Sequence, residues 1–327
     1  MDNRRKLVIA LGAGALAVPI GSFAQQQGKV WRVGFLGVAS AAGYVKEIDA
    51  IRAELRALGY AEGRNIMIEL RWAENDPARL KELAAELLAL KVDVIITHAT
   101  PGVRAASQAT KTVPIVIADG PDPVAGGFVA SLSRPGGNIT GSTGFQAELA
   151  AKRLELMKEV VPRIKHVSVL TNSQSGTWRN ALPGMEIAAK ALKLELHEVG
   201  VKAVEDFPGV FAAMAKKGVE AVVLGEDPLL NSNGSAIAAL AMAHRMPSVG
   251  LTTLPDAGGL LGYGANRPLL YGRAASFVDK ILKGAKPADM PIERATIFDL
   301  VVNLRIAKAL GINVPQHVLQ RANKVIE

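Results

Sequence analysis

The sequence predicts an α/β protein with two consecutive halves, each built on a mainly parallel sheet. Three observations support this prediction. Short β-branched apolar runs alternate with amphipathic helical segments, a pattern typical of βαβ units. The alternation stops at a breaker-rich stretch around residues 134–138 and then restarts. The length of 327 residues suits about two domains of ordinary size.

The first half is expected to hold four strands, at residues 30–38, 66–72, 93–98 and 113–118. Leucine and isoleucine at helical spacing predict helices between them. Asp76-Pro77 and Thr100-Pro101 each place a capping side chain before a proline, which is a common start of a helix. Strands connected by such helices are typical of one parallel sheet.

The stretch 113–144 marks the change from one half to the other. Its strand ends in a stiff acidic turn, Asp119-Gly120-Pro121-Asp122-Pro123, which two prolines restrain. A short helix is expected over 124–132, before the breaker at 134–138 and an extended run at 139–143. A lone strand after a breaker predicts that the chain leaves one sheet for another.

The second half repeats the alternation. Helices are expected at 149–160, 178–192, around 207–214 and at 235–245, and strands at 166–172, 194–199, 219–225 and 247–251. The tail adds a strand at 258–263, a helix at 268–282, a rigid breaker at 284–291, a strand at 292–302 and a helix at 305–310. Elements flanked by breakers predict further crossings between two domains that rotate about a cleft.

The N-terminus has the pattern of a secretory signal peptide. Arg4, Arg5 and Lys6 precede an apolar run over 7–20, and small residues then lead to Ala24. The apolar run is short for a membrane-spanning helix. We expect residues 1–24 to be removed and the remaining chain to work in the periplasm.

Composition excludes several classes of function. Cysteine is absent, which excludes disulfides, thiolate metal sites and cysteine nucleophiles. The net charge of +8 is spread over many segments without a basic run, so we expect no nucleic-acid partner. Neither a Gly-x-Ser-x-Gly elbow nor a phosphate loop occurs. The histidines lack metal-ligand spacing, so we expect no metal, no cofactor and no enzyme: His98, His166, His197, His244 and His317.

Four groups of residues carry a resemblance to a known family: Asp122-Pro123-Val124, the string at 135–141, the string at 281–291, and Asn303 with 307–311. On these strings, residues 30–327 resemble the ABC-transporter substrate-binding proteins that include the tryptophan-binding TrpX-type proteins. The resemblance implies a type I periplasmic-binding fold, with two Rossmann-like lobes joined by three hinge crossings. It places 28–141 and about 265–291 in lobe 1, and 142–264 and about 292–327 in lobe 2.

In such a fold, loops at the carboxyl ends of the strands line the cleft between the lobes. The candidate ligand contacts in the first lobe are Ser40, Thr100, Asp119 and Asp122. The candidates in the second lobe are Asn172, Ser175, Trp178, Glu226, Asp227, Thr252 and Tyr263.

Five of these candidates also have a structural interpretation. Thr100 caps its helix in either case, and a helix N-terminus is itself a site for a carboxylate. Asp122 fits a cap or hinge at least as well as a ligand contact. Trp178 either stacks on the ligand or packs against its own lobe. Glu226 and Asp227 either pair with a ligand ammonium or form a solvated turn.

The predicted function is that of a solute-binding protein for an ABC importer. We expect a monomer that closes over a small polar ligand, an amino acid or related carboxylate, and presents it to a membrane permease and its ATPase. The carboxylate would meet Thr100 and Ser40, and an ammonium would meet Glu226 or Asp227. One alternative is a ligand-sensing module for a membrane receptor. Another is an α/β enzyme with Asp122, Glu226 or His98 as acid–base groups.

Overall fold

Two β-sheets organise the computed structural model, which describes residues 29–120, 122–144, 146–174 and 181–327. The chain from Trp31 to Glu327 forms one compact unit. Within the described ranges, no helix is both long and apolar enough to cross a membrane. The predicted signal peptide, residues 1–24, lies outside the described residues.

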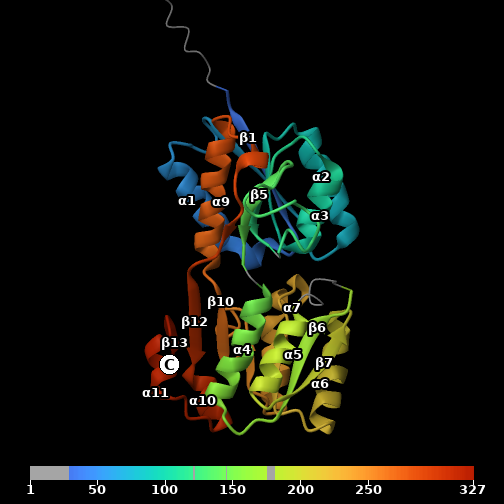
Figure 1. Ribbon diagram of the computed structural model, residues 1–327, viewed down its shortest axis with the longest axis vertical. Coiled ribbons are helices and arrows are strands. Elements are labelled where there is room, and N and C mark those ends of the chain that lie inside the picture. Colours follow the sequence, from blue (N-terminus) through green and yellow to red (C-terminus); the bar gives the residue numbers. More distant parts are fainter. Residues whose placement is uncertain (1–28, 121, 145, 175–180) are drawn as a thin grey trace, which may run out of the picture. The chain divides into compact units, whose positions relative to one another are not determined.

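The first sheet has six parallel strands in the order β11-β5-β4-β3-β1-β2. The strands are β1 (Trp31–Gly37), β2 (Ile66–Trp72), β3 (Val94–His98), β4 (Ile115–Asp119), β5 (Ile139–Thr143) and β11 (Glu293–Arg294). One face packs against α1 (Val45–Ala57) and α9 (Arg267–Leu282), and the other against α2 (Pro77–Ala89) and α3 (Ala99–Ala109) (Figure 1). The short helix η1 (Ala41–Tyr44) follows β1.

The second sheet has seven strands in the order β13-β12-β10-β9-β8-β6-β7, all parallel except the β10–β12 pair. The strands are β6 (His166–Asn172), β7 (Glu195–Val201), β8 (Ala221–Leu224), β9 (Ser248–Gly250), β10 (Leu261–Ala265), β12 (Phe298–Asn303) and β13 (Lys324–Ile326). One face carries α4 (Gln146–Val160), α5 (Leu182–Ala191), α10 (Leu304–Leu310) and α11 (Gln316–Arg321). The other carries α6 (Phe207–Lys216), α7 (Pro228–Ser232) and α8 (Gly234–Ala243). Short helices η3 (Val204–Asp206) and η4 (Pro287–Asp289) complete the elements named.

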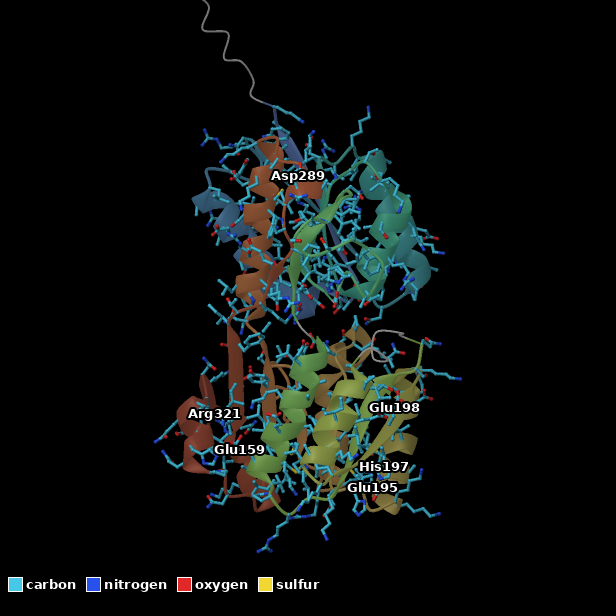
Figure 2. The ribbon with its side chains drawn as sticks, viewed as in Figure 1. Glu159, Glu195, His197, Glu198, Asp289 and Arg321 are labelled. Atoms are coloured by element: carbon cyan, nitrogen blue, oxygen red, sulfur yellow. The ribbon has the colours of Figure 1, made fainter. Side chains whose placement is uncertain are left out.

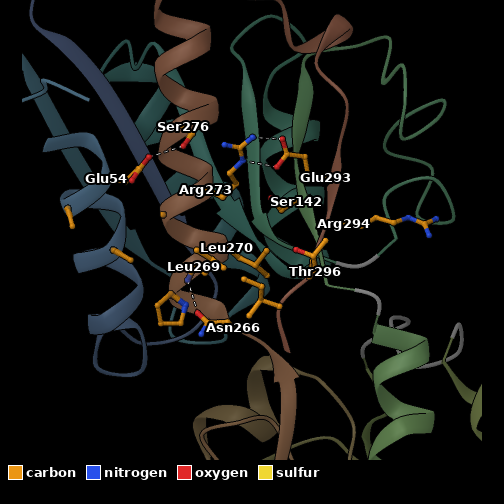
Figure 3. Close-up of a pocket in the computed structure, with 16 residues that line it drawn as sticks. Glu54, Ser142, Asn266, Leu269, Leu270, Arg273, Ser276, Glu293, Arg294 and Thr296 are labelled. Atoms are coloured by element: carbon orange, nitrogen blue, oxygen red, sulfur yellow. Dashed lines mark hydrogen bonds and ion pairs between the residues drawn. The ribbon is translucent and has the colours of Figure 1, made fainter. Parts of the chain in front are cut away.

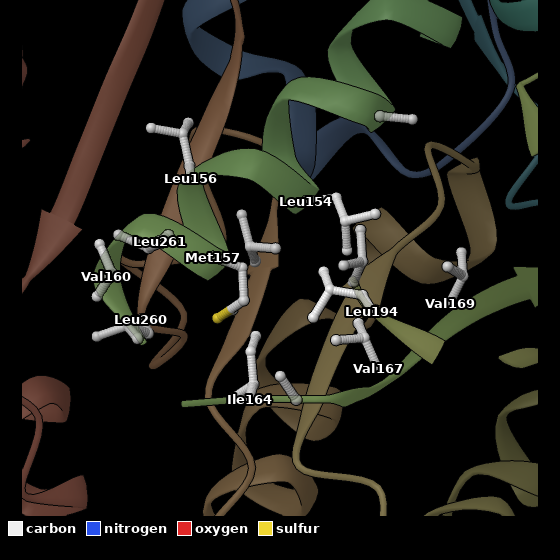
Figure 4. Close-up of a cluster of buried hydrophobic side chains, with 14 of the residues drawn as sticks. Leu154, Leu156, Met157, Val160, Ile164, Val167, Val169, Leu194, Leu260 and Leu261 are labelled. Atoms are coloured by element: carbon white, nitrogen blue, oxygen red, sulfur yellow. The ribbon is translucent and has the colours of Figure 1, made fainter. Parts of the chain in front are cut away.

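Aliphatic side chains fill the core between the second sheet and α4. Leu154, Met157 and Val160 recur at helical spacing on α4 and are buried against Val167 of β6 and Leu261 of β10 (Figure 4). Burying a side chain of this size stabilises the fold by about 1.5–3 kcal/mol. This packing holds α4 against the second sheet and so fixes where the ends of its strands lie.

The chain passes between the two sheets at three places, which confirms the predicted two-sheet α/β architecture. These places are between β5 and α4, between β10 and α9, and between β11 and β12. The structure explains why the string at 135–141 ends in a glycine, Gly141, which lies in β5. Its φ is +128°, and a Cβ atom there would lie 2.1 Å from the carbonyl oxygen of Ile117. Any larger residue would push β5 away from β4.

Two predicted elements were wrong. Residues 124–132 form successive turns instead of a helix, because Gly126 and Gly127 are poor helix formers and Gly127 takes a φ of +70°. The expected single strand at 292–302 is divided. Its first part, β11, pairs with β5, and its second part, β12, pairs with β10. The stretch serves both sheets, which a hydrophobic pattern alone does not reveal.

Candidate functional site

A small cavity lies where strands of both sheets end. Its volume is about 30 Å³. It adjoins the carboxyl ends of β3, β4 and β8, which is the edge where open α/β sheets bind their ligands. The residues that line it are Tyr44, His98, Ala99, Asp119, Glu226, Asp227, Pro228, Asn231, Leu251, Arg267 and Tyr271.

Aromatic rings form one side of this cavity. The ring centroids of Tyr44 and His98 are 4.6 Å apart, and each lies 6.1 Å from the ring of Tyr271. Behind them, Trp72 lies 5.5 Å from Tyr44 and 5.0 Å from Phe35. Only 5% of the sequence is aromatic, so this cluster gathers side chains that are rare in the rest of the chain. Such a wall suits contact with a flat ring.

His98 is held as a neutral ring. Its Nε2 accepts a hydrogen bond of 3.1 Å from the backbone N–H of Val38, which leaves the proton of the neutral ring on Nδ1. Nδ1 lies 3.4 Å from the Tyr44 hydroxyl. Burial lowers the pKa of His98 to about 3, and the charge of Arg267 acts in the same direction. A ring that stays neutral at physiological pH is a poor general acid, which counts against the enzyme alternative.

Arg267 brings a buried positive charge to the same wall. It is the first residue of α9, and its guanidinium lies 4.6 Å from the ring centroid of Tyr44 and 5.8 Å from that of Tyr271. It forms an ion pair of 3.4 Å with the carboxylate of Glu47, and both side chains are buried. The face of an aromatic ring stabilises such a cation. The guanidinium therefore remains charged beside the cavity.

Asp119 is a carboxyl group of the site with a strongly raised pKa. Its Oδ1 is buried and has no hydrogen-bond partner among the described residues. Burial, together with the negative charge of Glu226, raises the pKa of Asp119 to about 7, although Arg267 and Arg153 oppose the shift. Perturbed carboxyl groups of this kind concentrate at functional sites.

The helix α3 begins at the cavity wall. Its first residue, Ala99, takes a φ of +55°, which is uncommon for a residue with a Cβ atom. Thr100 is the second residue of α3 and His98 is the N-cap, so the prediction that Thr100 caps this helix was wrong. The helix begins one residue earlier than the Thr100-Pro101 pattern indicated. Strained backbone of this type is often found at ligand sites.

Glu226 and Asp227 come from the second sheet and already have partners. Glu226 accepts a 3.1 Å hydrogen bond from the guanidinium of Arg153, whose side chain is only 1% exposed. Asp227 caps α7 by accepting the N–H of Leu229 at 2.8 Å, and it also accepts the Nδ2–H of Asn172 at 3.1 Å. These contacts tie the two carboxylates to their own sheet.

The remaining candidates that the structure describes are not among the residues that line the cavity. Asp122 accepts the N–H groups of Val124 and Ala125, at 2.9 and 3.1 Å, and so caps an exposed turn. Tyr263 stacks on Phe298 with centroids 6.2 Å apart. Ser40 precedes η1, and Thr252 lies in the turn after β9. Ser175 and Trp178 fall outside the described residues.

Of the residues that line the cavity, only Asp119, Glu226 and Asp227 were among the predicted contacts. The charged and aromatic residues of this region that were missed include Tyr44, Arg153, Arg267 and Tyr271. Asn266-Arg267-Pro268 has the pattern of a helix start and follows a predicted crossing, so Arg267 could have been placed near the cleft. Tyr44 lies just beyond the loop at the end of the first strand. No local pattern distinguishes Arg153 or Tyr271 from ordinary helix residues.

A larger cavity of about 640 Å³ lies beside α1 and α9 (Figure 3). Two of its acidic groups are already bonded within the cavity wall. Arg273 donates two hydrogen bonds to Glu293, at 2.6 and 2.7 Å, and Ser276 donates to Glu54 at 3.0 Å. The hydrogen bonds from Arg273 lower the pKa of Glu293, so this carboxylate is already satisfied. Asp119 of the smaller cavity instead has a raised pKa and an oxygen without a hydrogen-bond partner among the described residues, so the smaller cavity is the better candidate site.

Comparisons with known proteins identify the family. The family model described as ABC transporter substrate binding protein matches residues 32–326. The tyrosine-binding protein of Clostridioides difficile (strain R20291) is 26% identical over 253 residues, which cover 77% of this chain and 72% of that protein.

Two solved structures are similar over almost their whole length. The ABC domain in complex with L-Trp from Streptococcus pneumonia has a TM-score of 0.85 and 26% identity, and the match covers 90% of this chain and 99% of that one. A conserved domain protein from Vibrio cholerae has a TM-score of 0.86 and 26% identity, over 91% of this chain and 100% of that one.

Proposed function

The chain belongs to the family of ABC transporter substrate-binding proteins, and we propose that it captures a free aromatic amino acid. We further propose that it is an exported monomer that hands this ligand to a membrane permease and its ATPase. The composition of the small cavity is the observation that supports this choice of ligand. It combines aromatic rings, a buried guanidinium and a carboxyl oxygen without a partner.

The carboxylate of the ligand is assigned to Arg267. A guanidinium offers five N–H donors, and a charged donor and acceptor form a strong hydrogen bond in a buried setting. The N-terminus of α3 adds a favourable partial charge at Ala99 and Thr100. Both features belong to the wall built on the first sheet.

The ammonium of the ligand is assigned to Asp119 in preference to Glu226 or Asp227. Asp119 has a buried oxygen without a hydrogen-bond partner among the described residues, whereas the other two carboxylates are engaged by Arg153, Asn172 and α7. An ammonium beside Asp119 would favour its ionised form and would satisfy that oxygen. Binding would therefore release a proton near neutral pH.

Entry of the ligand requires the lobes to separate. A volume of about 30 Å³ is close to that of one water molecule. The cavity walls come from both sheets, and three crossings connect those sheets, which is the arrangement of a hinge. Closure over the ligand follows if the contacts are made better in the closed state.

Calorimetry with defined ligands tests the proposed ligand class. We expect ligand-free protein to bind L-tryptophan or L-tyrosine, and to bind L-leucine at least tenfold more weakly because leucine lacks a ring. Indole-3-propionate lacks the ammonium and tryptamine lacks the carboxylate, so each should also bind at least tenfold more weakly than L-tryptophan. Equal binding of leucine, or no binding of any aromatic amino acid, would contradict the proposal.

Export is tested separately. The signal-peptide pattern supports cleavage after Ala24. Intact mass spectrometry of protein from the periplasmic fraction should give a chain that begins at Gln25. A mass that retains residues 7–20 would contradict export by this route.

A further inference from the structure

We propose that His166, Glu195 and His197 form a binding site for a transition-metal ion, with Zn²⁺ as the best fit. The three side chains lie on β6 and β7, at the end of the second sheet where these strands begin. Figure 2 shows Glu195 and His197 close together on β7. Nothing in the proposed capture of an amino acid requires this site.

Strand pairing brings the three residues onto one face. In the parallel β6–β7 pair, His166 lies directly beside Glu195. His197 follows Glu195 by two residues on β7, so it points to the same side of the sheet. The rings of His166 and His197 are nearly parallel, with an interplanar angle of 13° and centroids 6.3 Å apart.

The distances between the donor atoms match those of a metal site. Nδ1 of His166 lies 3.2 Å from one oxygen of Glu195, and Nε2 of His197 lies 3.2 Å from the other. One donor atom from each of the three residues lies within 4.8 Å of the others. Zinc ligands at about 2.0–2.1 Å in tetrahedral geometry are separated by about 3.3–3.5 Å. Small side-chain rotations are enough to place an ion between them.

The donor set selects the kind of metal. Two imidazoles and one carboxylate suit Zn²⁺ and its neighbours Ni²⁺ and Cu²⁺, whereas Mg²⁺ and Ca²⁺ prefer oxygen ligands. Three protein ligands leave a fourth position for water. The side chains of His166, Glu195 and His197 are 43%, 61% and 40% exposed, so an ion reaches them directly from solvent.

The backbone under the site is well anchored. Glu220 accepts hydrogen bonds from the N–H groups of Lys165 and His166, at 2.6 and 2.9 Å. The N–H of Glu195 donates to the carbonyl of Lys165 at 2.7 Å. These bonds fix the starts of β6 and β7 relative to each other, and so they limit the loss of freedom when an ion binds.

The site lies far from the candidate ligand cavity. Strand β6 begins at His166 and ends at Asn172, which contacts Asp227 of the cavity. Six residues of extended strand span about 20 Å. Metal binding and amino-acid binding can therefore be measured independently. The sequence alone predicted no metal site, because strand pairing unites ligands that are distant in the chain.

Calorimetric titration of the untagged full chain with Zn²⁺ tests the proposal, after removal of metals with a chelator. We expect one strong site per chain, with no comparable binding of Mg²⁺ or Ca²⁺. His166→Ala and His197→Ala should each weaken Zn²⁺ binding at least tenfold. The matched control is His317→Ala, because His317 is an exposed histidine on α11 that pairs with a different glutamate, Glu159, which Arg321 also contacts. This control should bind Zn²⁺ like the parent.

Cobalt spectroscopy gives a second readout that does not depend on the variants. Co²⁺ added to the parent chain should give the visible absorption of a low-symmetry, tetrahedral-type site, and Zn²⁺ should remove it. Absence of a stoichiometric Zn²⁺ site in the parent chain would overturn the proposal. An equal loss of binding in His317→Ala would also overturn it.

Discussion

The two walls of the candidate cavity place similar acidic side chains at strand ends but use them differently. The first-sheet wall consists of Tyr44, His98, Ala99, Asp119, Arg267 and Tyr271, and the second-sheet wall consists of Glu226, Asp227, Pro228, Asn231 and Leu251. In the first, Asp119 Oδ1 and Tyr271 Oη are buried and, within the described ranges, have no hydrogen-bond partner. In the second, both carboxylates are already engaged. We infer that the first wall selects the ligand and the second supports it.

This difference predicts opposite effects of charge removal on folding. A carboxyl group whose pKa is raised in the folded protein makes the fold less stable once it ionises. A carboxylate that pairs with a buried arginine has the reverse role, because its loss leaves the arginine uncompensated. The predictions below use this contrast, from the largest effect to the smallest.

Asp119→Asn should have the largest effect on binding. It removes the proposed partner of the ligand ammonium, and loss of such a buried charge pair costs on the order of 2–5 kcal/mol. We expect calorimetry to show at least about thirtyfold weaker binding of L-tryptophan, which is about 2 kcal/mol. Unchanged affinity would move the ammonium contact to the second-sheet wall.

The same variant should be more stable than the parent at pH 8. The folded pKa of Asp119 lies above its unfolded value of 3.8, so the folded state holds the proton more tightly. The ligand-free fold therefore loses stability as the pH rises from about 4 to about 7. Removing the charge should raise the free energy of unfolding at pH 8 by about 1 kcal/mol or more, as measured by urea denaturation. A destabilised variant would contradict this assignment.

Glu226→Gln should mainly destabilise the fold. Arg153 is almost completely buried and forms an ion pair with Glu226. The glutamine still accepts a hydrogen bond, so we expect a loss on the order of 2 kcal/mol in the free energy of unfolding, below the cost of deleting a partner outright. Urea denaturation measures this loss. Ligand affinity should fall less than in Asp119→Asn, and the reverse order would show that the second wall selects the ligand.

Tyr271→Phe should distinguish the contribution of the Tyr271 hydroxyl to ligand binding from its contribution to the stability of the fold. The hydroxyl is buried beside the Arg267 guanidinium but makes no hydrogen bond of regular geometry with the described residues, so its removal should change the free energy of unfolding by less than about 1 kcal/mol. If the hydroxyl contacts the ligand carboxylate, binding should weaken about tenfold, since a hydrogen bond to a charged group contributes about 1.5–3 kcal/mol. Calorimetry together with thermal unfolding distinguishes these effects. Wild-type affinity would remove Tyr271 from the contact set.

Asp122→Ala should have the smallest effect on the ligand. Asp122 caps an exposed turn by accepting the N–H groups of Val124 and Ala125, and it does not line the cavity. We expect a loss of about 1 kcal/mol in stability, as for other lost caps, with unchanged affinity for L-tryptophan. A change of tenfold or more in affinity would reopen its role as a ligand contact.

The sequence predicted the architecture well, because local patterns determine it. Apolar runs and capped helix starts such as Asp76-Pro77 identified most of the strands and helices. The carboxyl ends of the strands were also a sound guide to the region of the cavity. Failures arose where one stretch serves two sheets, as at 292–302, or where paired glycines prevent a helix, as at 126–127.

The chemistry of the cavity was less accessible from the sequence. Glu226 is held by Arg153 on α4, whereas Asp119 lacks a comparable partner, and this difference depends on contacts between distant segments. Tyr44 and Arg267 meet only because α9 returns to the first sheet after the chain has built most of the second. No spacing rule along the chain reports such contacts.

The pH dependence of ligand affinity tests the central role of Asp119 most directly. The charges of L-tryptophan do not change between about pH 6 and pH 8, whereas Asp119 titrates near pH 7 under the influence of burial, Glu226, Arg267, Glu47 and Arg153. Calorimetry should show that the affinity of the parent falls as the pH is lowered through 7, approaching tenfold per pH unit below the pKa. In Glu226→Gln, the affinity should also fall as the pH is lowered, but the fall should occur at lower pH. Asp119→Asn should bind L-tryptophan weakly, with no dependence of affinity on pH. A parent affinity that stays constant between pH 6 and pH 8 would contradict the account.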